Sequence, residues 1–214
     1  MSKIYLELLD KNRQTLFQKL SAFVGYGYLA GGTALALQIN HRKSVDFDVF
    51  VEKPIKNALH LAIKKVFGPQ NYEVNTEDQL TFSPQTGSEV TFLWYYWKPI
   101  LPLVATPSLS LASTQDIAAD KAHTLGRRAL WRDYVDLFVL MKNQGISIQS
   151  IVISAKKKFQ GDFVETQFLE QLSYFNDVTI VPVEFVNISY TPEEIKSFLV
   201  QQVESYLKTV LPTG

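Results

Sequence analysis

The stretch 31-GGTALALQINHRKSVDFDVF-50 combines a glycine pair, a basic loop and two aspartates separated by one residue. Its end alternates Asp with Val and Phe, which predicts a strand over 45–51 with both carboxylates on one face. Carboxylates on one face repel each other, and Mg²⁺ suits such hard oxygen ligands while leaving room for phosphate oxygens. Asp46 and Asp48 are therefore candidate magnesium ligands, with a solvated strand face as the alternative.

The residues before these aspartates predict a phosphate-binding loop. Glycines at the start of a short helix let backbone N–H groups approach a phosphate closely, although a tight turn also uses glycine. The loop arginine can form a forked pair with a phosphate, the alternative being simple exposure to solvent. The candidate nucleotide-binding residues of this segment are Gly31, Gly32, Thr33, Arg42 and Ser44.

A second block, 116-DIAADKAHTLGRRALWRDYVDLFVL-140, lies in a helical pattern that runs from 113 to about 142, in one piece or two. In one continuous helix, Lys121, Arg128 and Arg132 would project within roughly 40° of one another. Such a cationic stripe favours phosphate or an RNA backbone. Asp136 lies one turn beyond Arg132 and could pair with it. The opposite stripe is expected in the core: Ile117, Leu125, Leu137 and Leu140.

Together the two blocks resemble the AbiEii/AbiGii-type toxins of the nucleotidyltransferase superfamily. The resemblance covers roughly residues 28–140 and includes Gly-Gly-Thr-x-Leu, His-Arg-x-Ser-x-Asp-x-Asp and the later Arg-Asp-x-x-Asp-Leu. It implies that Lys121 and Asp136 are functionally important, beside Asp46 and Asp48 as catalytic metal ligands. It also implies an NTP substrate, an RNA acceptor such as tRNA, and a cognate antitoxin protein as partner.

The chain departs from the superfamily at the third carboxylate that many nucleotidyltransferases place on a neighbouring strand. Thr91 occupies the usual acidic position, and Glu89 lies two residues earlier on the same face. Glu89, Asp136 or a water molecule remain alternatives for completing the site.

The amino-acid composition excludes several classes of protein. The 214 residues are 46% hydrophobic and 20% charged, which excludes disorder over most of the chain. The absence of cysteine excludes disulfides, thiol catalysis and cysteine-based zinc sites. A net charge of zero argues against a generally basic nucleic-acid coat but permits a local patch. Without a signal-like N-terminus or a membrane-length apolar run, we expect a soluble cytoplasmic protein.

The pattern along the chain predicts an α+β fold. A nucleotidyltransferase-like N-terminal mixed sheet with helices is expected over residues 1–112, followed by a mainly helical C-terminal module over 113–214. Outside the two blocks, helices are predicted over 4–24, 55–67, 147–159, 164–172 and 192–207, and strands over 70–74, 79–83 and 89–97.

Three other features are interpreted as structural. The run 94-WYYW-97 is assigned to core and strand edge, with nucleobase stacking as the alternative. Lys156-Lys157-Lys158 is assigned to a solvated helix face, with RNA contact as the alternative. His60 and His123 are expected to be exposed or partly buried on helices.

The sequence thus predicts a Mg²⁺-dependent nucleotidyltransferase that moves a nucleotide from an NTP to an acceptor hydroxyl. RNA, and tRNA in particular, is the expected acceptor, in a type IV toxin–antitoxin or phage-defence system. The alternatives are a small-molecule nucleotidyltransferase and a catalytically silent nucleotide- or partner-binding module.

Overall fold

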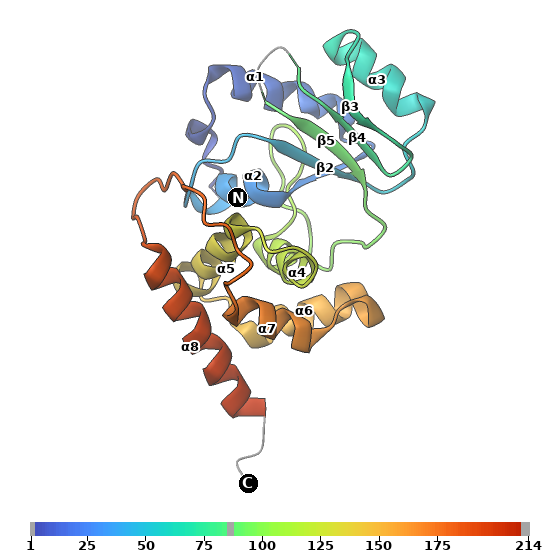
Figure 1. Cartoon of the computed structure of the whole chain (residues 1–214). Coiled ribbons are helices and arrows are strands. Elements are labelled where there is room, and N and C mark those ends of the chain that lie inside the picture. Colours follow the sequence, from blue (N-terminus) through green and yellow to red (C-terminus); the bar gives the residue numbers. More distant parts are fainter. Residues whose placement is uncertain (1–2, 85–87, 211–214) are drawn as a thin grey trace. The chain divides into compact units, whose positions relative to one another are not determined.

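The computed structural model describes residues 3–84 and 88–210, and the chain separates into two compact units, Met1–Ser113 and Thr114–Gly214 (Figure 1). The described part of the N-terminal unit contains a five-stranded mixed sheet, and that of the C-terminal unit is helical. The predicted α+β fold with a helical C-terminal part is therefore confirmed. Within the described residues, no helix has the length and apolar character needed to cross a bilayer.

The sheet of the N-terminal unit has the strand order β1-β2-β5-β4-β3. β2 and β5 run parallel, and the other neighbouring strands are antiparallel. β2 is an internal strand between β1 and β5, so Asp48 lies on an internal strand rather than on an edge strand. The strands are β1 Gly27–Ala30, β2 Phe47–Val51, β3 Tyr72–Asn75, β4 Gln79–Phe82 and β5 Val90–Trp94.

The alternation in β2 decides which face of the sheet is packed. Phe47, Val49 and Val51 are fully or almost fully buried, while Asp48 and Phe50 on the other face are half-buried. Phe47 stacks on Phe17 of α1 at 6.3 Å between ring centroids, so α1 covers the apolar face. Figure 1 shows α1 and α3 on the same side of the sheet. The helices of this unit are α1 Lys11–Lys19, α2 Gly31–Ile39 and α3 Asn57–Phe67, with the short 3-10 helices η1 Leu6–Leu8 and η2 Leu20–Phe23.

The C-terminal unit follows the helical periodicity of the sequence. α8 begins as predicted, because the Glu194 carboxylate accepts from the Thr191 N–H at 2.7 Å and the Thr191 hydroxyl accepts from the Glu194 N–H at 3.2 Å. Ser147 caps α6 by accepting from the Ser150 N–H at 3.1 Å. Its elements are α4 Thr114–Leu125, α5 Trp131–Gln144, α6 Ile148–Phe159, η3 Gln160–Asp162, α7 Glu165–Ser173 and α8 Pro192–Val210.

Several predicted boundaries were wrong. The helix predicted over 4–24 is interrupted, because the Asp10 side chain accepts from the Arg13 N–H at 2.9 Å and starts α1 there. Residues 27–30, for which no strand was predicted, form β1, which pairs antiparallel with β2. β2 begins at Phe47, so Asp46 precedes the strand instead of lying within it.

Candidate active site

Asp48 lies near the start of the internal strand β2 and against the start of α2. In register it pairs with Ala30 of β1 on one side and Thr91 of β5 on the other. Gly31 has φ +67°, and a Cβ built on it would lie 2.4 Å from Asp48 Oδ2. Glycine is therefore required here for both reasons, the left-handed backbone and the close approach of the carboxylate.

Gly32 allows an equally close approach of the basic loop, residues 41–44. A Cβ at this position would lie 2.6 Å from Arg42 Nη2 and 3.1 Å from Ser44 Oγ. Arg42 is only 4% exposed, and its Nη1 donates to the Lys43 carbonyl at 3.1 Å. The interpretation of Arg42 as a solvated loop side chain is thus wrong, because the loop folds its guanidinium onto the first turn of α2.

Thr33 ties the same loop to the strand that follows. Its hydroxyl lies 2.9 Å from Ser44 Oγ and donates to the Asp46 carbonyl at 2.5 Å. Since Thr33 is almost fully buried in the first turn of α2, it fixes the chain immediately before β2 relative to the helix. The structure therefore brings together all of the predicted phosphate-binding residues of the N-terminal unit with Asp46 and Asp48.

Asp46 is half-buried and its Oδ1 accepts from the Glu89 N–H at 3.3 Å. The position expected for a third acid is filled by Thr91, whose hydroxyl lies 3.1 Å from Thr81 Oγ1 and donates to Glu89 Oε1 at 3.3 Å. Glu89 shares the face of Thr91, as predicted, and its backbone holds Asp46. Thr91 itself supplies no carboxylate to this face.

The donor set fits one Mg²⁺ shared with a phosphate. In residues 3–84 and 88–210, no group of three or more His, Cys, Asp and Glu side chains forms a closed metal cage. The two aspartates instead supply oxygen donors beside the phosphate-binding candidates of α2. Mg²⁺ commonly takes one or two carboxylates and completes its shell with water and substrate phosphate oxygens. Asp46 and Asp48 meet that description.

Lys121 lies in a buried ion cluster of the C-terminal unit. Its Nζ is 2.7 Å from Asp133 Oδ1 and 2.6 Å from Asp136 Oδ2. Burial alone would lower the pKa of Lys121, but the charges of Asp136 and Asp133 outweigh burial and raise it above its ordinary value. Lys121 is therefore a protonated lysine held by two buried carboxylates.

The predicted cationic stripe does not form. α4 ends at Leu125 and α5 begins at Trp131, so Lys121, Arg128 and Arg132 do not lie on one continuous helix. Arg128 lies in the connection, exposed, with its Nε 3.8 Å from Asp133 Oδ2. Arg132 is exposed at the start of α5, while Asp136 is fully buried against Lys121. The predicted pairing of Arg132 with Asp136 was therefore wrong as well.

A second buried cluster was missed by the sequence analysis. Lys158 of α6 lies 3.2 Å from Asp116 Oδ1 and 2.7 Å from Asp120 Oδ1, both on α4. The assignment of Lys158 to a solvated face was wrong, although Lys156 and Lys157 are exposed. The signal was present, because Lys158 continues the buried i, i+3, i+4, i+7 stripe that begins at Ile151.

His123 packs beside this second cluster on α4. Its ring stacks on Phe159 with 4.0 Å between centroids and 6° between planes. Burial, followed by the positive charge of Arg127, lowers the pKa of His123 to about 4. The imidazole is therefore neutral at pH 7 and serves as a flat packing surface.

Solved structures share the fold of this chain. JHP933 from Helicobacter pylori has a TM-score of 0.57 at 16% identity, covering 94% of this chain and 94% of that chain. MenT4, the nucleotidyltransferase toxin Rv2826c from Mycobacterium tuberculosis H37Rv, has a TM-score of 0.61 at 15% identity, covering 94% and 84%. The fold expected from the sequence resemblance is thus confirmed.

The chain belongs to the same family as the uncharacterized protein aq_aa25 of Aquifex aeolicus (strain VF5). The two are 30% identical over 191 residues, which cover 85% of this chain and 88% of that protein. No family model matches the chain.

Proposed function

We propose that this protein is a Mg²⁺-dependent nucleotidyltransferase that moves a nucleotide from an NTP to an acceptor hydroxyl. The observation that carries the proposal is the Asp48 carboxylate seated against Gly31 at the start of α2, with Arg42 and Ser44 against Gly32. A carboxylate, a buried guanidinium and a helix N-terminus in one small region suit a metal-bound polyphosphate. The nucleotidyltransferase fold supports the same conclusion.

Asp46 and Asp48 would hold the Mg²⁺. When bound, the ion would neutralise phosphate charge and increase the acidity of the acceptor hydroxyl. The chain's own residues orient the substrate: the first-turn N–H groups at Gly32 and Thr33 would donate to phosphate oxygens, and Arg42 would form a forked pair with them. Ser44 would donate its hydroxyl. Thr33 keeps this loop fixed to α2 through the Asp46 carbonyl.

The roles that the resemblance implies for the C-terminal unit are part of this proposal. Lys121 is protonated and would stabilise negative charge that develops during transfer. Asp136 is fully buried against Lys121, so we assign it a positioning role rather than the orientation of a nucleophile. Arg128 and Arg132 are exposed cations and remain candidates for contact with nucleic acid.

RNA, with tRNA first, is the proposed acceptor, and the proposed setting is a toxin–antitoxin or phage-defence system with a partner antitoxin. The resemblance of the two sequence blocks supports this, as does the name of MenT4 as a nucleotidyltransferase toxin. A catalytically silent nucleotide-binding module is the second candidate. It is favoured by Thr91, which stands where many relatives in the superfamily place a third acid.

The test is transfer of α-labelled NTPs, each supplied separately with Mg²⁺, to total cellular RNA, to the protein alone, or without acceptor. We expect label in RNA, and a fall of about 100-fold or more in Asp46→Asn and Asp48→Asn. Calorimetric titration of Mg²⁺–NTP should show weaker binding in the same variants while their thermal unfolding stays close to wild type.

Other outcomes would redirect the assignment. Label on the protein itself would indicate a protein acceptor. A folded wild-type protein that binds Mg²⁺–NTP but transfers nothing to RNA would contradict the RNA acceptor and favour a small-molecule acceptor or the silent module.

A further inference from the structure

A cluster of aromatic rings lies on the same face of the sheet as Asp48. The alternation in β2 places Asp48 and Phe50 on the face opposite to the buried Val49. Phe50 pairs in register with Tyr28 of β1, and the two rings meet edge-on with 5.9 Å between their centroids. On the side of β5, the Tyr95 ring lies 4.1 Å from the Phe50 ring, with 32° between their planes. Aromatic side chains thus continue this face beyond the proposed metal ligand.

Tyr95 directly follows β5 and is held by the backbone of β2. Its N–H donates to the Val51 carbonyl at 2.9 Å. The Trp97 ring lies 5.2 Å from the Tyr95 ring and extends the cluster. Phe50, Tyr95 and Trp97 are half-buried, so they are partly open to solvent. Tyr95 belongs to the run 94–97, for which nucleobase stacking is the alternative interpretation, and its place beside Phe50 favours that alternative.

The groups on this face follow the order of the parts of an NTP. The first turn of α2, which carries the phosphate-binding candidates, contacts Asp46 and Asp48. Phe50 lies two residues beyond Asp48 along β2, or about 7 Å at roughly 3.3 Å per residue. In an NTP, one ribose separates the α-phosphate from the base. With its triphosphate on α2 and its α-phosphate at the metal, the NTP would reach Phe50 and Tyr95 with its base.

We infer that the rings of Phe50 and Tyr95 bind the nucleobase of the NTP by stacking. The inference rests on the proposed function and adds a base site to it. Stacking on aromatic rings tolerates every base, because each base has a π-face. The cluster should therefore favour an NTP over a bare polyphosphate and accept all four bases with modest preferences.

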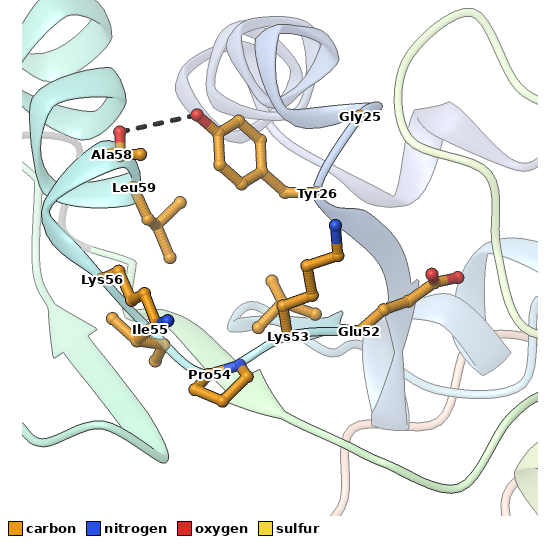
Figure 2. Close-up of a pocket in the computed structure, with 10 residues that line it drawn as sticks. Gly25, Tyr26, Glu52, Lys53, Pro54, Ile55, Lys56, Ala58 and Leu59 are labelled. Carbon is orange, nitrogen blue, oxygen red and sulfur yellow. Dashed lines mark hydrogen bonds between the residues drawn. The ribbon is translucent and has the colours of Figure 1, made fainter.

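A pocket of about 430 Å³ where β2 ends and α3 begins is the competing place for a base (Figure 2). Its lining includes Val51 and Tyr26, and the Tyr26 hydroxyl donates to the Ala58 carbonyl at 3.5 Å. Val51 lies on the buried face of β2, opposite to Asp48. A base in this pocket would be separated by the sheet from a phosphate at the metal, so the pocket serves as the comparison site in the test.

The experiment measures by calorimetry the dissociation constants of each Mg²⁺–NTP and of Mg²⁺–tripolyphosphate, which lacks ribose and base. The full-length variants are Phe50→Leu, Tyr95→Leu and Tyr95→Phe, the last of which keeps the ring. The matched control is Tyr26→Leu, which also removes a half-buried tyrosine ring, but beside the pocket of Figure 2. Because binding needs no turnover, this readout separates the base site from the transferase activity.

We expect wild type to bind each Mg²⁺–NTP more tightly than Mg²⁺–tripolyphosphate. Phe50→Leu and Tyr95→Leu should raise the dissociation constant of Mg²⁺–NTP about tenfold and change that of Mg²⁺–tripolyphosphate by less than about twofold. Tyr95→Phe and Tyr26→Leu should both bind like wild type. If this pattern is found but wild type transfers no nucleotide, the proposed function fails and the base site stands.

Equal weakening of both ligands in Phe50→Leu and Tyr95→Leu would indicate a structural effect and overturn the inference, as would equal binding of the two ligands to wild type. Loss of Mg²⁺–NTP affinity in Tyr26→Leu alone would overturn it by assigning the base to the pocket of Figure 2. Unchanged Mg²⁺–NTP affinity with a higher KM for RNA in Phe50→Leu and Tyr95→Leu would assign the rings to the acceptor and overturn the NTP base site.

Discussion

Replacement of Gly31 by alanine tests the geometry on which the active-site assignment depends. The residue has φ +67°, where an L side chain is strained, and its missing Cβ leaves the space occupied by Asp48 Oδ2. Gly31→Ala therefore perturbs the proposed metal ligand without changing any charge, metal donor or phosphate donor.

The expected losses of stability and of transfer rate in Gly31→Ala follow from two separate effects. The left-handed backbone costs an alanine roughly 1–2 kcal/mol of stability. A Cβ would lie 2.4 Å from Asp48 Oδ2, while ordinary contacts begin at 3.4 Å, so the carboxylate oxygen has to move by about 1 Å. A misplacement of about 1 Å in a catalytic constellation costs about 100-fold in rate, which corresponds to about 2.7 kcal/mol of transition-state stabilisation.

Gly145→Ala is the matched control, because Gly145 has φ +68° and no heavy atom within 4 Å of the added Cβ. Both variants should lose roughly 1–2 kcal/mol in urea unfolding. Nucleotide transfer should fall about 100-fold only in Gly31→Ala, and Mg²⁺–NTP binding by calorimetry should weaken only there. Transfer by Gly31→Ala within threefold of Gly145→Ala would refute the placement of Asp48 as a metal ligand.

The other predictions concern the C-terminal unit. Lys121→Met and Lys158→Met each leave two buried carboxylates without their cation, so each should lower the free energy of unfolding in urea by about 3–5 kcal/mol. Lys157→Met, on the exposed face of α6, should lower it by less than about 0.5 kcal/mol. Replacing Lys158 together with both carboxylate partners by apolar residues should recover most of that loss, and failure to recover would mean that the ions themselves stabilise the unit. The pKa of His123 is about 4 in the folded chain and near 6.5 when unfolded, so the unfolded state binds the proton first as the pH falls. Stability should therefore decline between pH 6.5 and 4, by at most about 3 kcal/mol, and His123→Gln should remove that part of the slope in pH-dependent thermal unfolding. An unchanged slope would contradict the low pKa.

The candidate site residues of the N-terminal unit could be located from the sequence because their signals are local. The alternation around Asp46 and Asp48 has period 2, and it correctly separated the buried face of β2 from the face that carries Asp48. The glycine pair also gave a local signal. β1 was missed because its four residues gain their hydrogen bonds from β2, some twenty positions later in the chain.

The second block shows where local periodicity stops being informative. Its apolar stripe was predicted correctly, since Leu125 and Leu137 are buried whether or not the helix is interrupted. The charged stripe depends on the phase carried from one helix to the next, and the connection at 126–130 changes that phase. The apolar stripe within α6 indicates the burial of Lys158, but its carboxylate partners come from the contact of α6 with α4, which no pattern within α6 alone specifies.

The buried ion clusters on α4 favour one arrangement of α5 and α6 around it. Asp116 and Asp120 present anions to Lys158 of α6, while Lys121, about 100° further around the same helix than Asp120, presents a cation to α5. Buried ion pairs contribute little net stability compared with apolar residues of similar size. They discriminate strongly between arrangements, however, because exchanging α5 and α6 would bring Lys158 against Lys121 and carboxylates against carboxylates. We therefore expect the apolar replacement of the Lys158 cluster to keep the stability of the unit. Its near-ultraviolet circular dichroism should weaken, because the side chains no longer adopt a single packing arrangement. A near-ultraviolet spectrum of that variant as strong as that of wild type would show that apolar packing alone selects the arrangement.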